Sequence, residues 1–179
     1  MTGMEWHTGY EQAREKAHKT FLKQLKKDAK AAKQNFILYG MGKVMPEPEY
    51  DLPLNAEGEA AIYVVSRISG EGNDRTPLKG DIRLTDSEVR DILALDKKFT
   101  RFMLVLNVGG VVDLSPVMSV RNILLLSQLG VETGGALADI LLGKANPSGK
   151  LTTTWAAFEE YPEMPDFEDM NETRYREGI

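Results

Sequence analysis

The chain has 179 residues, which suits a single domain, because domains usually hold roughly 100 to 200 residues. With 42% hydrophobic and 27% charged residues, the composition indicates a soluble globular chain and excludes a collagen-like or wholly disordered one. The net charge of -5 argues against a nucleic-acid partner, and the absence of cysteine excludes disulfides, thiolate zinc sites and cysteine nucleophiles.

No membrane contact, metal or cofactor is predicted. The longest apolar runs fall short of the roughly 18 residues of a membrane span, and residues 1–10 lack the features of a secretory signal. We therefore expect a cytoplasmic location. Only His7 and His18 are available as imidazole ligands, and both are distant in sequence from any acidic cluster, so we expect no metal site and no cofactor.

A long basic helix is predicted over about residues 10–34. Apolar residues recur at every fourth position and form one stripe, at Ala13, Ala17, Phe21, Leu25 and Ala29. Between residues 11 and 33 eight basic residues stand against three acidic ones, so we expect the remaining surface of the helix to be rich in lysine. Residues 35–40 then predict a short strand, and prolines in residues 45–51 predict an exposed loop.

Three further strands are predicted at residues 60–65, 101–107 and 122–126. Each is a nearly continuous apolar run, which is typical of a strand covered on both faces. A short final strand is expected at residues 150–155.

Two helices separate or follow these strands. Thr85 and Glu88 have the spacing of a capping box, which predicts a helix from there to about Lys98. A second helix is expected from the glycine-rich turn at residues 130–135 to Gly143.

Alternating strands and helices predict a mostly parallel sheet covered by helices. We therefore expect a three-layer α/β/α sandwich, flavodoxin-like in general form, over residues 1–155. We expect residues 156–179 to form a separate acidic extended arm, since residues 159–177 carry eight acidic side chains against two basic ones. Ligands of such sheets lie beyond the carboxyl ends of the strands.

The loop after the strand at residues 60–65 holds the candidate site. Glu71 stands between two glycines, and Asp74 and Arg75 follow it closely. A dinucleotide fingerprint is not favoured, because Arg75 occupies the place of its third glycine. Two interpretations remain: a structural loop in which Arg75 pairs with Asp74 or Glu71, or a general acid at Glu71, which would need a raised pKa.

A single carboxylic acid such as Glu71 does little for hydrolysis by itself. Cleavage of a glycoside, for example, usually needs two carboxylates. Asp113 follows a neighbouring strand and is one candidate, although we favour a role in capping the turn at Ser115. No other acidic residue of the chain stands out as the partner of Glu71.

Several blocks together resemble the second domain of glycoside hydrolase family 3, the β-glucosidase family. They are residues 61–75 with their Gly-Glu-Gly-x-Asp-Arg motif, 79–81, 104–107, 110–114 and the Asn-Pro-Ser-Gly-Lys-Leu block at 146–151. The resemblance covers about residues 36–155. Asn73 departs from it, because family members often have an aromatic residue there.

The resemblance implies a retaining β-glycosidase in which a TIM-barrel domain supplies an aspartate nucleophile and this sandwich supplies the acid/base, Glu71. Asn73, Asp74 and Arg75 are then the substrate loop, and a β-glucoside or oligosaccharide is the substrate. It also implies that the first strand of the sandwich, the barrel and a fibronectin-like domain beyond the arm are missing, so we expect an isolated fragment to be inactive.

A non-catalytic binding or scaffold module is the alternative. Self-association through surface that the other domains would cover is also left open.

Overall fold

A computed structural model of the chain describes residues 3–55, 57–68 and 74–161. In this part of the chain the sheet is parallel, with strand order β1-β2-β3: β1 (Ala60–Ser66), β2 (Arg101–Asn107) and β3 (Ile123–Leu125). The register places Ser66 opposite Asn107 and Leu104 opposite Ile123. All three strands therefore point their carboxyl ends the same way.

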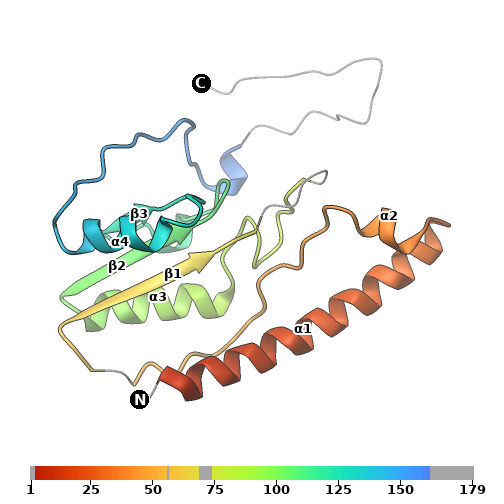
Figure 1. Cartoon of the computed structure of the whole chain (residues 1–179), viewed down its shortest axis with the longest axis horizontal. Helices are drawn as coiled ribbons and strands as arrows, with labels where there is room; N and C mark the ends of the chain where they lie inside the picture. The colour runs from red at the N-terminus through yellow and green to blue at the C-terminus, as the bar shows by residue number, and fades with distance from the viewer. Residues whose placement is uncertain (1–2, 56, 69–73, 162–179) are drawn as a thin grey trace.

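Helices cover both faces of this sheet (Figure 1). α3 (Asp86–Lys98) packs on the face that presents Leu104 and Leu106, whereas α4 (Thr133–Leu141) packs on the face that presents Val105. Because successive side chains of a strand point to opposite faces, the two helices lie on opposite sides. The predicted α/β/α sandwich is confirmed.

The start of α3 is fixed by the capping box that its sequence predicts. The Glu88 N–H donates to Thr85 Oγ1 at 3.0 Å, and the Thr85 N–H donates to Glu88 Oε2 at 2.8 Å. Both side chains are buried, so the first turn of α3 is held firmly against the core.

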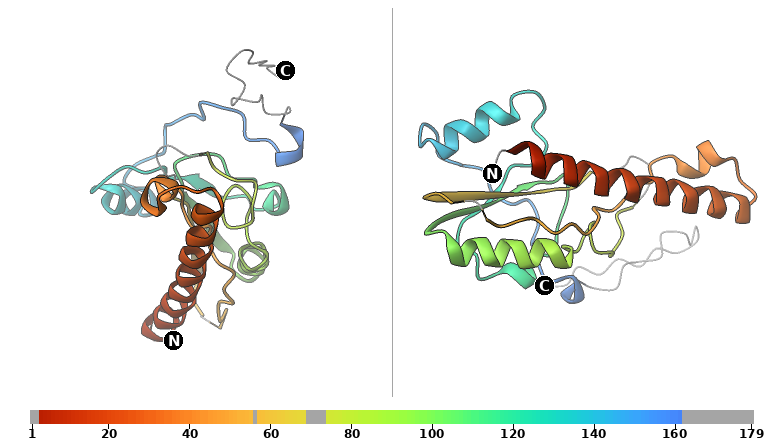
Figure 2. Two further views of the ribbon diagram at one scale, coloured as in Figure 1. Left: turned by 90° about the vertical axis from the view of Figure 1, so that its right-hand side faces the viewer. Right: turned by 90° about the horizontal axis from the view of Figure 1, so that it is seen from below.

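The basic helix α1 (Gly3–Ala31) contains most of the predicted span and lies beside the sandwich (Figure 2). Among the side chains of α1 whose burial is described, residues 9–31, Leu25 and Ala29 in the last turns are buried, and α1 packs there against α2 (Phe36–Gly40). Near the other end Tyr10 is half-buried and contacts Glu47 and Tyr50. The rest of its lysine-bearing surface is exposed.

The strand predicted at residues 35–40 is wrong, because this segment is α2. Asn35 Oδ1 accepts hydrogen bonds from the N–H groups of Ile37 and Leu38, at 2.9 and 3.4 Å, and so starts a helical turn. Strand preference depends on a neighbouring strand to pair with, and none lies beside this segment among the described residues.

The other predicted helices and strands agree with the structure except at residues 150–155, where no strand forms. In the described part of the chain these residues make no backbone ladder; instead the Tyr161 hydroxyl donates to the Thr154 carbonyl at 3.1 Å, and Trp155 packs against the core.

The loop at residues 45–51 lacks regular structure as predicted, but it is not exposed: five of its seven residues are partly buried, because Glu49 accepts hydrogen bonds from the start of α3. Short 3₁₀ turns lie at Ser115–Val117 and Phe158–Glu160. None of the described helices is long and apolar enough to cross a membrane.

Candidate functional site

The loop that carries Glu71 follows the carboxyl end of β1, as expected for a ligand site in a parallel sheet. Residues 69–73, including Glu71 and Asn73, lie outside the described residues. The residues on either side of this gap are described, so the site is built from its two ends: Arg67 and Ile68 before it, and Asp74 and Arg75 after it.

Arg67 anchors the start of the loop. Its side chain is buried, and its Nη1 and Nη2 donate to the two carboxylate oxygens of Glu88 at 2.8 and 2.6 Å. Its Nε donates to the Asp81 carbonyl at 2.9 Å. A two-pronged guanidinium–carboxylate pair fixes orientation as well as distance, so the chain leaves β1 from a defined position.

Arg75 anchors the other end of the loop. Its Nε donates to Asp81 Oδ1 at 2.7 Å and its Nη1 to the Val111 carbonyl at 2.6 Å. The structural-loop interpretation paired this arginine with Asp74 or Glu71, whereas its partners in the described part of the chain are Asp81 and Val111. The Asp74 side chain is exposed.

Asp81 connects the two anchors. Its backbone carbonyl accepts from Arg67, and its carboxylate accepts from Arg75 and from the N–H and hydroxyl of Thr76, at 2.6 and 2.8 Å. Partial burial acts to raise the pKa of this carboxyl, but the hydrogen bonds from Thr76 and Arg75 outweigh it and hold the pKa below its usual value. Asp81 is therefore a stable anion at neutral pH.

The turn that presents Asp81 requires a glycine at position 80. Gly80 has a φ of +84°, and a Cβ placed there would lie 2.0 Å from the Glu47 carbonyl oxygen. The Glu47 N–H donates to the Gly80 carbonyl at 2.7 Å, which ties residues 44–50 to this turn. Sequence reasoning assigned Asp81 no role; its membership of the block at residues 79–81 was the available signal.

Asp113 caps the turn at Ser115, as the sequence predicts. Its Oδ1 accepts the Ser115 N–H at 2.9 Å, and its side chain is buried. Its backbone N–H donates to the Ile82 carbonyl at 2.8 Å, beside the anchor turn. Asp113 therefore supports the site's framework.

A cavity of about 320 Å³ lies beside the start of the loop. Its polar lining includes Tyr10, Arg14, Glu47, Ser66 and Asp81. Tyr10 donates its hydroxyl proton to Glu47, and burial together with this carboxylate raises the pKa of the phenol. Hydroxyl, carboxylate and guanidinium groups of this kind are suited to hydrogen bonding with a polyhydroxylated ligand.

The fold and the anchored loop define an α/β-sandwich domain whose ligand edge lies at the carboxyl ends of parallel strands. The family model described as the glycosyl hydrolase family 3 C-terminal domain matches residues 3–179, and the chain belongs to this family.

Among curated relatives, the chain is 36% identical over 151 residues to β-glucosidase A of Butyrivibrio fibrisolvens, covering 69% of this chain and 18% of the relative. It is 30% identical to a β-glucosidase of Ruminococcus albus, covering 68% of this chain and 13% of the relative. The chain thus spans less than a fifth of the length of these relatives.

A solved structure of β-glucosidase 3B from Thermotoga neapolitana, in complex with α-D-glucose, is similar in fold. It has a TM-score of 0.55 and 34% identity, and the match covers 77% of this chain and 20% of that one. The match supports the sandwich fold of this chain.

Proposed function

We propose that this chain is the acid/base-bearing domain of a retaining β-glycosidase of the β-glucosidase type, with Glu71 as the acid/base. The observation that carries the proposal is that the acidic loop is tied at both ends, by Arg67 and Arg75, to one residue, Asp81, at the ligand edge of the sheet. The β-glucosidase relatives support the reaction class.

In the first step, the glycosidic oxygen leaves the anomeric carbon and takes a proton from the Glu71 carboxyl group. A carboxylate from a barrel domain attacks the same carbon and forms a glycosyl-enzyme. In the second step, the Glu71 carboxylate removes a proton from the water that attacks the anomeric carbon, and the bond from that carbon to the barrel carboxylate breaks. The sugar is released, Glu71 is again protonated and the nucleophile is again a free carboxylate. One side chain thus gives a proton and takes one back.

The anchors fit this role, because an acid/base must be held within hydrogen-bond reach of the departing oxygen. In the proposal Asn73 and Asp74 contact the substrate, a β-glucoside or oligosaccharide, while Arg75 positions the loop from behind. Residues 1–155 form the sandwich domain, and the arm at residues 156–179 leads toward a fibronectin-like domain.

The acid/base role is tested by Glu71→Ala in the intact enzyme that carries this domain. We expect kcat/KM for an alkyl β-glucoside to fall at least 100-fold more than for 2,4-dinitrophenyl β-glucoside, whose leaving group needs no proton. Added azide should accelerate turnover of the activated substrate and yield β-glucosyl azide. Glu59→Ala, at an exposed carboxylate next to β1, is the matched control and should leave both rates unchanged. Equal losses for both substrates would contradict the proposal.

The dependence on a second domain is tested with the 179-residue chain alone. We expect no turnover of 4-nitrophenyl β-glucoside, because the nucleophile is supplied elsewhere. Turnover by the purified chain that disappears in Glu71→Gln would show that this chain holds a complete site, and would overturn the division of labour.

A further inference from the structure

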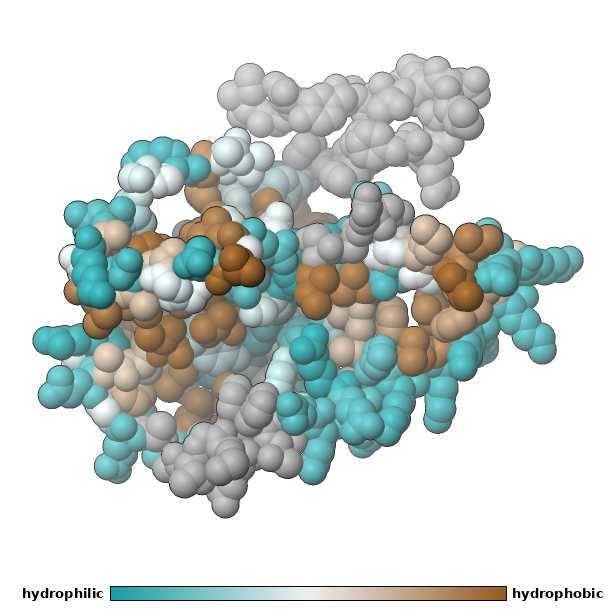
Figure 3. Space-filling view, viewed as in Figure 1, coloured by the Kyte–Doolittle hydropathy of each residue, from teal (hydrophilic) through white to brown (hydrophobic). Residues whose placement is uncertain are grey.

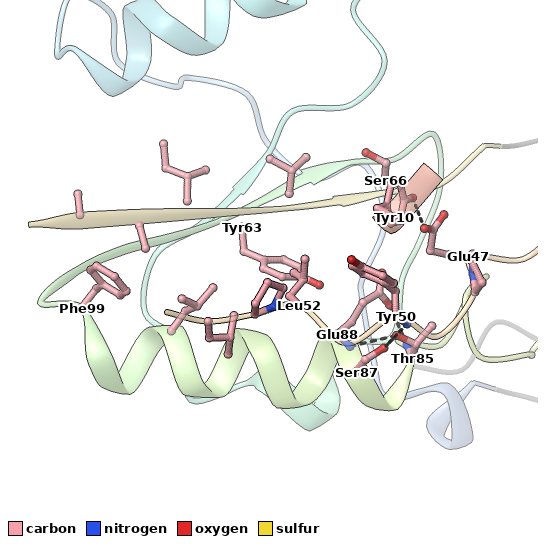
Figure 4. Close-up of a pocket in the computed structure, with 18 of the residues that line it drawn as sticks. Tyr10, Glu47, Tyr50, Leu52, Tyr63, Ser66, Thr85, Ser87, Glu88 and Phe99 are labelled. Carbon is pink, nitrogen blue, oxygen red and sulfur yellow. Dashed lines mark hydrogen bonds between the residues drawn. The ribbon is translucent and has the colours of Figure 1, made fainter. Parts of the chain in front are cut away.

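Residues 46–52, which we call the strap, contact both α1 and α3 (Figure 4). The Glu49 carboxylate accepts hydrogen bonds from the N–H groups of Asp86 and Ser87, at 2.8 and 2.9 Å, at the start of α3. The Tyr50 N–H donates to Ser87 Oγ at 3.1 Å. An anion at a helix start is stabilised by the free N–H groups and by the helix dipole, so the strap is fixed against the first turn of α3.

Glu47, near the beginning of the strap, is bound to α1. Tyr10 of α1 donates its hydroxyl proton to the Glu47 carboxylate (Figure 4). The rings of Tyr10 and Tyr50 also meet edge to face, with their centroids 5.7 Å apart and their planes at 74°. A phenol that donates to a carboxylate makes a charge-assisted hydrogen bond, which is stronger than a neutral one. Tyr10 therefore holds the strap from the side of α1.

The backbone of Glu47 continues this contact to the turn that anchors the acidic loop. Its N–H donates to the Gly80 carbonyl at 2.7 Å. Asp81 follows Gly80 and accepts hydrogen bonds from the two arginines at the ends of the loop. A continuous series of hydrogen bonds and one peptide unit therefore leads from the Tyr10 hydroxyl to both ends of the loop.

The contact between Glu47 and this turn is close. A Cβ at Gly80 would lie 2.0 Å from the Glu47 carbonyl oxygen and 2.8 Å from its nitrogen. With so little space between them, Glu47 cannot move toward the turn without displacing it. Tyr10, Glu47, Ser66 and Asp81 all line the cavity of about 320 Å³ beside the start of the loop. The contact therefore lies at the candidate site.

We propose that Tyr10 and Glu47 are positioning residues for the acid/base loop, an inference that rests on the role proposed for Glu71. The Tyr10 hydroxyl fixes Glu47, Glu47 fixes the turn at residues 80–81, and this turn fixes both ends of the loop. Neither residue touches the substrate. Without the Tyr10 hydroxyl, the Glu71 carboxyl group is held less often within reach of the departing oxygen, so proton transfer slows.

The effect on catalysis is tested with Tyr10→Phe in the intact enzyme that carries this domain. We expect kcat/KM for an alkyl β-glucoside to fall about fivefold and that for 2,4-dinitrophenyl β-glucoside to change less than twofold, because only the first leaving group needs a proton. Tyr39→Phe is the matched control, since it removes a hydroxyl from α2, where the ring contacts Lys43, and it should leave both rates unchanged. A merely structural contact would lower both rates alike, and equal losses in Tyr10→Phe would overturn the inference.

Glu47 is tested by comparing Glu47→Gln with Glu47→Ala. Glutamine keeps an oxygen that accepts the Tyr10 proton, whereas alanine removes it. We expect Glu47→Ala to show the same selective loss with the alkyl β-glucoside as Tyr10→Phe, and Glu47→Gln to retain kcat/KM within twofold. An equally large selective loss in both variants would show that the hydrogen bond to Tyr10 does not position the loop.

Amide hydrogen exchange separates this inference from the role of Glu71, because it needs no catalysis. In the 179-residue chain we expect residues 74–83 to exchange about fivefold faster in Tyr10→Phe than in the wild type, while β2 exchanges at the same rate in both. Tyr39→Phe should match the wild type throughout. Unchanged exchange at residues 74–83 would overturn the inference even where Glu71→Ala shows the leaving-group effect. If Glu71→Ala lacks that effect, the proposed function fails, and exchange at residues 74–83 still decides whether Tyr10 holds the anchor turn.

Discussion

The two faces of the sheet differ in how completely they are covered. On the α3 side, Ile92, Leu104 and Val117 are fully buried in a continuous core. On the α4 side the buried cluster consists of Val105, Leu124 and Leu126, and α4 itself contains no buried residue. Figure 3 shows apolar residues gathered at the surface around α4. The stability of the chain therefore resides on the α3 side, and the α4 side offers surface for contacts.

The polar groups follow the same division. α3 begins with a capping box whose Glu88 also neutralises Arg67, so one carboxylate serves the helix start and the loop anchor. α4 begins at Glu132 with no side-chain cap. Substitutions on the α3 side should consequently lower the free energy of unfolding more than substitutions on the α4 side.

The largest effect is expected for Glu88→Ala, which leaves the buried Arg67 without its counter-charge and removes half of the capping box. We expect the free energy of unfolding to fall by about 4 kcal/mol, measured by urea denaturation. Lys79→Ala is the control: it breaks the exposed pair of Lys79 with Asp86 and should cost less than about 1 kcal/mol. Similar costs for the two variants would show that the buried pair does not stabilise the α3 side.

Ile92→Ala comes next, because it opens a cavity in the core under α3. We expect a loss of about 3 kcal/mol, against less than about 0.5 kcal/mol for Leu142→Ala just beyond α4, where the side chain is 69% exposed. Equal losses in urea denaturation would contradict the assignment of stability to the α3 side.

Much of the α3 side could be predicted from sequence, because its signals are local. Thr85 and Glu88 are three residues apart and specify their own hydrogen bonds, and the apolar runs of β1 and β2 specify burial. Residues 35–40 could not be assigned correctly in the same way, because a short apolar run can form either a strand or a helix. The outcome depends on whether a neighbouring strand is available for pairing or an N-cap such as Asn35 precedes the run.

The sequence predicts where the loop of the candidate site lies in the fold, but it does not predict which contacts hold the two ends of that loop. The acidic loop follows from the strand pattern before it, and the resemblance singles out Glu71. Arg67 and Arg75 both donate hydrogen bonds to Asp81 because the turn at Gly80 brings separate segments of the chain together. The spacing of residues along the sequence does not reveal such contacts.

Asp81→Asn tests the loop anchors and carries a pH signature. At neutral pH we expect a loss of about 2 kcal/mol, since the carboxylate accepts charged and backbone hydrogen bonds. The folded-state pKa of Asp81 is depressed, so its contribution is fully present above the usual carboxyl pKa and disappears as the pH falls through the lower folded-state value. The difference between wild type and variant, from urea denaturation at several pH values, should shrink on acidification; a constant difference would exclude this anionic role.

The smallest change in the free energy of unfolding is expected for substitutions at the starts of α3 and α4. These two substitutions compare the two faces of the sheet directly. Thr85→Ala removes the side-chain acceptor for the Glu88 N–H and should cost about 1 kcal/mol in urea denaturation. Glu132→Ala at the start of α4 removes no cap and should change stability by less than about 0.3 kcal/mol. If both variants lose the same amount, the capping box is not what distinguishes the two helices, and the contrast between the faces would rest on packing alone.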